Sequence, residues 1–238
     1  YLLDVAMDAD SELITAINVI PANGDETVDA QVLITQEESA QGNDVQALSI
    51  DGIGFRGKRL REWQDPQGLN LEVFVPPAPL PKPTDYFTPQ DFATEDEGER
   101  LRCPAEQATR RRYRTSNDSG WQYQFTRATC AACPLWARCM ARLPQHNGRV
   151  VVKNDYQAEY AAARQKAQTP EYAKVRQQHP AIERKLAELV RVHRMRWARY
   201  RKQARVRIQA LLTALVVNIK RMVHLSASAR LQPASGGA

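Results

Sequence analysis

Long apolar runs are missing from this chain of 238 residues, and none approaches the roughly 20 residues that a membrane-spanning helix needs. The sequence begins at Tyr1 without the basic flank and small-residue cleavage site of a signal peptide, and without an initiator methionine. These absences predict a protein with neither a transmembrane span nor a signal peptide. The missing methionine indicates a fragment.

Basic residues are absent from the first fifty positions, which hold ten acidic side chains. Residues 171–225 show the opposite bias, with fourteen Lys or Arg against three Glu. Such a segment has a positive field that can attract a polyanion, with an affinity that falls as the salt concentration rises. A solvated, charge-rich helical face would explain the same run of charges equally well.

Cysteine is absent outside one segment of 37 residues, which holds all four: Cys103, Cys130, Cys133 and Cys139. The spacing of Cys130 and Cys133 is that of a metal-binding knuckle, and four thiolates complete a tetrahedral structural zinc site. Such a site would stabilise a segment too small and polar to fold on its own core. The alternatives are two disulfides, which a cytosolic setting disfavours, free thiols, or an iron–sulfur cluster.

The first 75 residues alternate between strand and helix patterns. Leu2–Met7 and Leu13–Ile20 predict a β-hairpin around a turn at Asp8–Ser11. A helix capped by Asp25 or Thr27 follows, and Val45–Ile50 and Leu71–Val75 predict two further strands.

Six prolines between Pro76 and Pro89 exclude a central strand or a helix interior there. We interpret residues 76–150 as an insertion rich in proline and cysteine. Residues 151–225 follow a helical pattern, and residues 226–238 predict a disordered tail. One apolar stripe has helical spacing near the end of the chain: Ile208, Leu211, Leu212, Leu215, Val216, Ile219, Met222 and Val223. The pattern as a whole predicts an α/β layer fold with long carboxy-terminal helices.

Two acidic residues are candidates for metal chemistry. Asp51 follows a short apolar strand, where α/β folds place ligands, and its carboxylate could bind Mg²⁺. An Asp-Gly pair is also common in plain turns. Glu183 falls in the first turn of a helix that begins near Pro180, where the helix dipole alone favours an acid. Each residue taken alone is therefore explained by local structure.

A basic helix is predicted from Arg184 to Arg207, with Trp197 and Tyr200 between its cations. Cations neutralise phosphates, and aromatic rings stack on bases or pack against a core. His179 and His193 are too isolated to argue as ligands or general bases. The candidate DNA-binding residues are Arg184, Lys185, Arg191, Arg194, Arg196, Arg199, Arg201 and Lys202.

The order of these features resembles the DDE transposases of bacterial insertion sequences, over almost the whole chain. Residues 5–25 are similar to that family's second and third strands, and Leu48–Phe55 (LSIDGIGF) to the "ADxGY" segment with the second catalytic aspartate. The cysteine segment resembles the insertion of one large subgroup. Residues 182–185 and 211–222 resemble the terminal helices, which carry the catalytic glutamate.

This resemblance implies an RNase H-like mixed sheet, in which Asp51 and Glu183 bind Mg²⁺ (or Mn²⁺) for cleavage and strand transfer at transposon ends. It also implies double-stranded DNA as substrate, a homodimer as the active complex, and a cytoplasmic, nucleoid-associated location in a bacterium. The sequence matches no first strand bearing the first catalytic aspartate, so we expect a truncation before it. Asp4 and Asp8 are weak substitutes, because Asp8 is predicted to lie in the hairpin turn.

One further departure concerns the tyrosine–arginine–glutamate signature, which expects Arg four residues before Glu183. His179 stands there, and Arg176 lies one turn earlier. Two rival hypotheses remain: a non-catalytic DNA-binding protein derived from a transposase, and a simple nuclease of the same fold.

Overall fold

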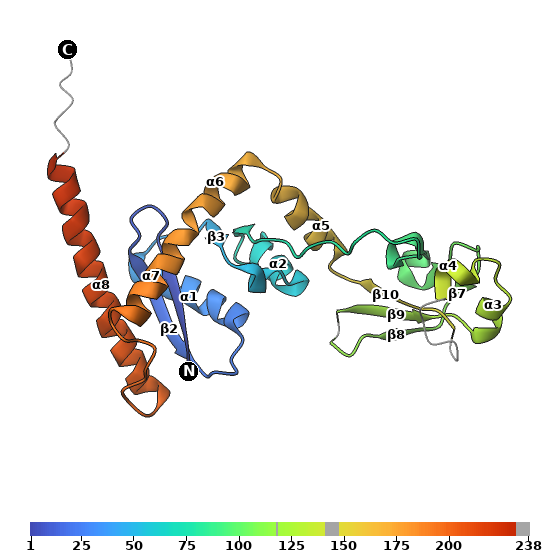
Figure 1. Ribbon diagram of the computed structural model, residues 1–238, viewed down its shortest axis with the longest axis horizontal. Helices are drawn as coiled ribbons and strands as arrows, with labels where there is room; N and C mark the ends of the chain where they lie inside the picture. The colour runs from blue at the N-terminus through green and yellow to red at the C-terminus, as the bar shows by residue number, and fades with distance from the viewer. Residues whose placement is uncertain (118, 141–147, 232–238) are drawn as a thin grey trace, which may run out of the picture. The chain divides into compact units, whose positions relative to one another are not determined.

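The computed structural model describes residues 1–117, 119–140 and 148–231, and the chain divides into two compact units. The first comprises Tyr1–Pro77 with Ala163–Ala238, and the second comprises Ala78–Ala162. Both units mix helices with small sheets, so the fold is mixed α/β (Figure 1).

The first unit opens with the hairpin of β1 (Leu2–Met7) and β2 (Ile14–Ile20), which pair antiparallel. In its turn, the carboxylate of Asp8 accepts hydrogen bonds from the backbone N–H of Ser11 at 2.7 Å and from its hydroxyl at 2.6 Å. Asp8 therefore serves the hairpin, as its local sequence predicts.

Helix α1 (Glu26–Gln41) follows, capped by Asp25, whose side chain accepts from the N–H of Thr27 at 3.0 Å. It ends at Gly42, whose φ of 67° is the left-handed conformation that glycine adopts most easily. Strands β3 (Ala47–Ser49) and β4 (Glu72–Phe74) are parallel, with helix α2 (Gly57–Gln64) in the crossover between them.

Four helices complete the chain: α5 (Gln157–Lys166), α6 (Pro170–Gln178), α7 (Pro180–Arg191) and α8 (Gln203–Leu231). Strand β2 packs on α7 and α8 through a shared core that includes Val19, Leu189, Ala210 and Val217. Asn218 fastens the edge of β2: its oxygen accepts from the N–H of Ile14 at 2.9 Å, and its amide donates to the carbonyl of Ile14 at 2.8 Å.

The second unit contains two three-stranded sheets, ordered β10-β9-β8 and β5-β6-β7. Its core joins aromatic and sulfur side chains, including Phe92, Tyr123, Phe125 and Cys130. The elements are β5 (Ala93–Glu95), β6 (Arg100–Arg102), β7 (Ala108–Thr109), β8 (Arg112–Arg114), β9 (Gly120–Gln124), α3 (Arg127–Ala131), α4 (Trp136–Met140) and β10 (Val150–Asn154), with short 3₁₀ turns at Pro89–Asp91 and Asp96–Gly98.

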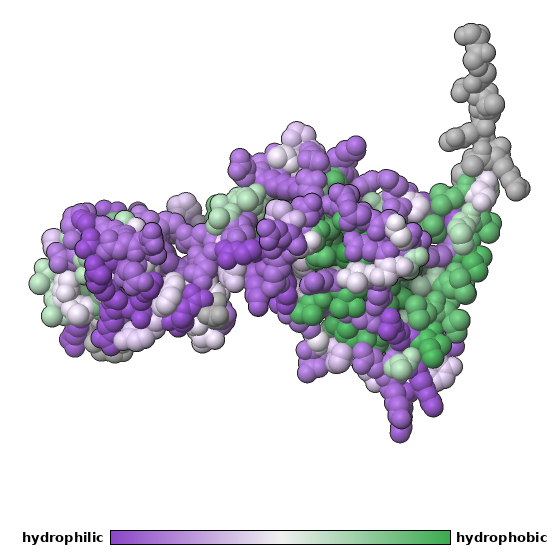
Figure 2. Space-filling model, turned by 180° about the vertical axis from the view of Figure 1, so that it is seen from behind, coloured by the Kyte–Doolittle hydropathy of each residue, from purple (hydrophilic) through white to green (hydrophobic). Residues whose placement is uncertain are grey.

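The apolar stripe of α8 does not lie in the core. Figure 2 shows apolar side chains gathered on the surface of this helix, and all eight stripe residues are exposed. The opposite face is buried instead, through Val206, Ala210, Ala214 and Val217. Small alanines allow the helix to approach β2 closely, which explains why the less apolar face makes the contact.

Among the described helices, α8 alone is long and apolar enough to cross a membrane by length and composition, over Gln203–Ala227 with a mean hydropathy of 1.3. The sequence shows no uninterrupted apolar run there, because basic residues interrupt the apolar ones. One face of α8 packs on β2, as that of a core helix does, so this measure is weak evidence for a membrane span.

Two boundaries differ from the sequence expectation. The basic segment is not one helix, since α7 ends at Arg191, a loop follows, and α8 begins at Gln203. The tail expected from Ser226 is helical up to Leu231, because this stretch contains neither Gly nor Pro to end the helix. Residues 232–238 lie outside the described part of the chain.

Replacing Asn218 with Ala should leave the N–H and carbonyl of Ile14 without their partners on α8. We expect the free energy of unfolding to fall by about 1–3 kcal/mol, the usual cost of stranding partly buried polar groups. Urea denaturation followed by circular dichroism measures this loss. Met222→Ala, an exposed change one turn later on α8, should cost much less; equal losses would show that Asn218 has no special role.

Candidate functional site

Asp51 lies directly after β3 and is exposed. Its Oδ1 accepts a hydrogen bond from the N–H of Ile53 at 3.0 Å and so caps the 3₁₀ turn Gly52–Gly54. A Cβ on Gly54 would lie 2.5 Å from Cγ2 of Ile50, so this turn needs glycine there. Asp51 therefore both caps the turn and presents an exposed carboxylate at the end of β3.

The corner between α6 and α7 is fastened to the end of β3. Arg176 donates from Nη1 to the carbonyl of Ile50 at 3.0 Å and to Oγ of Ser49 at 3.3 Å. Nδ1 of His179 lies 3.5 Å from the same Oγ. This corner therefore lies against the residue that precedes Asp51.

Glu183 is exposed in the first turn of α7, which begins with Pro180 at its first position. The pKa of His179 is lowered by burial and by Arg176, while the charges of Glu183 and Asp51 both act to raise it. Both carboxylates are thus within electrostatic range of one imidazole. His179, which the sequence left without a role, thus experiences the charges of both predicted acids.

Among the residues that the structure describes, no three His, Cys, Asp or Glu side chains are grouped as a bound metal ion requires. Asp51 and Glu183 therefore do not belong to any group of three potential metal ligands among these residues. Asp8 is committed to its turn. Asp4 is on β1, half-buried beside the carboxylates of Asp29 and Glu26.

Burial and a hydrogen bond with Asp29 raise the pKa of Asp4 to about 7. Oδ2 of Asp4 and Oδ2 of the buried Asp29 both lack a hydrogen-bond partner in the described structure. A proton shared between them satisfies both atoms and removes one of two neighbouring charges. Oδ1 of Asp29 accepts from the amide of Asn18 at 2.6 Å, so this small polar group is fixed between β2 and α1.

The predicted DNA-binding cations divide into two sets. Lys185 is buried and lies 3.7 Å from Glu188, so its side chain is not exposed as a DNA contact would require. Arg184 is exposed but pairs with Glu12 at 3.4 Å. The remaining cations are exposed, and the described residues give them no acidic partner: Arg191, Arg194, Arg196, Arg199, Arg201 and Lys202.

Most of these cations lie in the loop of residues 192–202, which also presents Trp197, 71% exposed, and Tyr200, 52% exposed. Buried Gln209 on α8 holds this loop, since its Oε1 accepts from the N–H of Arg199 at 2.9 Å and its Nε2 donates to the carbonyl of Trp197 at 3.1 Å. Positive φ angles at Arg194 and Lys202 turn the chain at either end. Trp197 and Tyr200 are therefore exposed to solvent on a loop that Gln209 holds in place; residues 192–202 are called the braced loop below.

The four cysteines are free thiols and line one small pocket in the second unit. Cys130 and Cys133 form a tight turn, with the N–H of Cys133 donating to the carbonyl of Cys130 at 3.1 Å, and the N–H of Arg149 donates to Sγ of Cys130 at 3.3 Å. Burial raises the pKa of the Cys139 thiol. The charge of Arg149 lowers this pKa, and the other three cysteines raise it further. The disulfide alternative is thus not realised.

The pKa of Asp4 makes stability depend on pH. An unfolded aspartate loses its proton near pH 4, whereas Asp4 in the fold loses it at about 7. The folded chain binds the extra proton between these values, so the free energy of unfolding should fall as pH rises through this window. Urea unfolding at pH 5 and pH 8 measures the fall. Asp4→Asn should remove it and the exposed Asp10→Asn should keep it; a fall unchanged in Asp4→Asn would contradict this assignment.

Comparison with known proteins identifies the family. A family model described as the transposase DDE domain matches residues 102–223, just over half of the chain. The match includes the cysteines, Glu183 and most of α8, whereas Asp51 precedes it. No curated protein and no solved structure matches the chain. The chain belongs to the transposase DDE domain family.

Proposed function

We propose that this chain is the scaffold of a transposase that cleaves and joins DNA at insertion-sequence ends through Asp51 and Glu183. Family membership implies DNA as substrate and transposition chemistry in general. The observation that supports the assignment is that the charges of Asp51 and Glu183, which come from distant parts of the chain, both act on His179. Arg176 supports it by fastening the corner before α7 to the strand that ends at Asp51.

The cofactor in this proposal is Mg²⁺ or Mn²⁺, hard cations that bind carboxylate oxygens. When bound, a pair of such ions supplies an activated water or 3′-hydroxyl and stabilises the leaving oxygen. Both carboxylates are exposed and so open to hydrated ions and to phosphates. Arg176 and His179 keep the end of β3 and the start of α7 in place.

We further propose an RNase H-like core in which a strand outside the described residues lies between β1 and β3. Among the described strands, β1 pairs with β2 alone and β3 with β4 alone, so the outer edges of β1 and β3 are both open. A strand between those edges would join the two sheets, and an aspartate on it would supply the missing third carboxylate. Asp4, which is half-buried beside Asp29, is a poor substitute.

The exposed loop cations and Arg191 are the proposed contacts to double-stranded DNA, because Arg and Lys bind phosphates wherever no carboxylate competes. Two copies acting on paired ends in a bacterial cytoplasm remain part of the proposal. A non-catalytic DNA-binding role is the second candidate. The observation that favours it is the absence, among described residues, of a third ligand beside Asp51 and Glu183.

Asp51→Asn and Glu183→Gln should each weaken Mn²⁺ binding at least tenfold, because each removes a charged ligand from a two-carboxylate site. Electron paramagnetic resonance of free Mn²⁺ in titrations measures this loss. Glu171→Gln, which changes a glutamate in the first turn of α6, is the matched control. The same substitutions should abolish Mg²⁺-dependent nicking by a protein extended with an upstream strand that ends in Asp.

Full nicking by the extended Asp51→Asn protein would sink the catalytic assignment. Salt-dependent DNA binding with unaltered Mn²⁺ binding in both variants would favour the non-catalytic role. Hydrolysis products without joined strands would favour a simple nuclease of the same fold.

We also propose that the four cysteines hold a structural Zn²⁺. Two observations support this: all four side chains line one pocket, and the N–H of Arg149 donates to Sγ of Cys130, as happens to metal-bound thiolates. Their present spacing does not group three of them as a bound ion requires, so side-chain rotation would have to draw the sulfurs together. A fourfold thiolate set also needs a cation to offset its mutual repulsion.

Purified protein should therefore contain close to one zinc per chain by elemental mass spectrometry. Cys133→Ser should lower that content and the melting temperature of the second unit, because a zinc site supplies folding energy to a small module. Ser119→Ala, in the same unit but away from the pocket, is the control. Absence of zinc together with unchanged melting after chelation would remove the proposal.

A further inference from the structure

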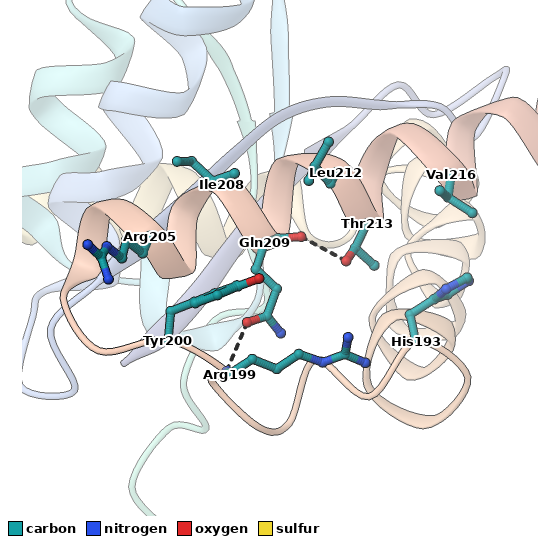
Figure 3. A pocket seen from close by; sticks show the side chains of 9 residues that line it. All are labelled: His193, Arg199, Tyr200, Arg205, Ile208, Gln209, Leu212, Thr213 and Val216. Carbon is teal, nitrogen blue, oxygen red and sulfur yellow. Dashed lines mark hydrogen bonds between the residues drawn. The ribbon is translucent and has the colours of Figure 1, made fainter.

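A pocket of about 500 Å³ lies between α8 and the loop of residues 192–202. Figure 3 shows Tyr200 and Gln209 on the side of α8 that faces the loop, with the side chain of Arg199 extending toward His193. The volume falls within the range of pockets that hold small organic ligands. Neither the paired carboxylates nor the cysteines contribute to it.

The lining has three chemical parts. Ile208, Leu212 and Val216 supply apolar surface from α8. Tyr200 supplies a half-exposed aromatic ring. Arg199 and Arg205 supply charge, so a planar apolar group bearing an anion fits all three parts.

Charge decides between the possible occupants. The lining contains no Asp or Glu, and the sequence has none after Glu188. Seven cations lie between positions 194 and 207, and two of them, Arg199 and Arg205, line the pocket. A second α8 placed here would bring its own Arg and Lys against these cations, which repel it. A nucleic acid brings phosphates instead.

The pocket is also built rather than incidental. Gln209 is nine-tenths buried, and its side-chain amide bonds to the backbone of both Arg199 and Trp197. The hydroxyl of Thr213 donates to the backbone carbonyl of Gln209 at 2.8 Å. The loop that carries Tyr200 is therefore held before any ligand arrives. Nε2 of His193 makes no hydrogen bond in the described structure and lies 3.8 Å from Oε1 of Glu188.

We propose that this pocket receives one unpaired nucleotide of the DNA substrate, with its base on the Tyr200 ring and its phosphates near Arg199 and Arg205. Stacking suits any base, because every base has an apolar face. Glu183 lies eight residues before Arg191, the last residue of α7, about 12 Å along the helix. His193 follows two residues beyond that end, so the pocket lies past the end of α7 that is opposite Glu183.

This inference rests on the proposed function, because it takes DNA as the substrate. Its test compares two fluorescein-labelled duplexes that differ only by one bulged thymidine, using fluorescence anisotropy. The full chain should bind the bulged duplex more tightly. Tyr200→Ala should remove that preference, a loss of roughly 5- to 100-fold for one stacked base, while its affinity for the paired duplex changes little.

Three variants keep the result specific. Tyr200→Phe keeps the ring and should keep the preference. Tyr113→Ala removes a comparably exposed tyrosine from the second unit and should change nothing. Arg201→Ala removes a neighbouring cation that does not line the pocket, so it should weaken both duplexes equally. Circular dichroism checks that each variant is folded.

An equal affinity of the parent chain for both duplexes, or a preference that survives Tyr200→Ala, would overturn the proposal. A dimer in sedimentation that dissociates on Tyr200→Ala would assign the pocket to a second copy and overturn it as well. No binding to either duplex would remove the proposed function too. A bulge preference in a chain that fails to bind Mn²⁺ would support the pocket and reject only the catalytic assignment.

Discussion

Packing of β2 on α8, in a core that α7 shares, is the contact on which the remaining geometry depends. Val19, Leu189 and Ala210 meet in one core, and Asn218 adds hydrogen bonds to the open edge of β2. This core fixes the direction of α7, and therefore of Glu183 in its first turn. At the start of α7, just before the turn that carries Glu183, Arg176 and His179 secure the corner against β3. An acid on a helix thereby reaches the neighbourhood of an acid at a strand end.

Local signals in the sequence predicted the elements that local physics decides. Asp25 caps α1, Pro180 opens α7 and Asp8 closes the hairpin, as expected. In each case the deciding hydrogen bond or backbone angle lies within a few residues of the signal. The parallel pairing of β3 with β4 joins strands that follow one another along the chain, with α2 in the crossover between them.

Features set by distant partners could not be predicted in this way. The break after Arg191 depends on Gln209, which bonds to the loop from the next helix. Lys185 looks like any other cation in the run, yet tertiary packing buries it. His179 has no neighbouring signal in the sequence, and its interest comes in part from Ser49 and Asp51, which lie far earlier in the chain. Likewise, the face of α8 that is buried is the one that packs on β2, although hydropathy alone predicts burial of the opposite face.

The uneven charge of the chain also gains a physical meaning from the fold. Glu12, from the acidic first fifty residues, pairs with Arg184 and Arg221, and Glu188 pairs with Lys220 at 2.7 Å. These pairs neutralise the cations that lie beside the hairpin and α7. The loop cations face no such acid among the described residues, so their field is directed outward. A net charge of +6 therefore understates the attraction for phosphates, because the remaining positive charge is concentrated at the loop that also presents the aromatic rings.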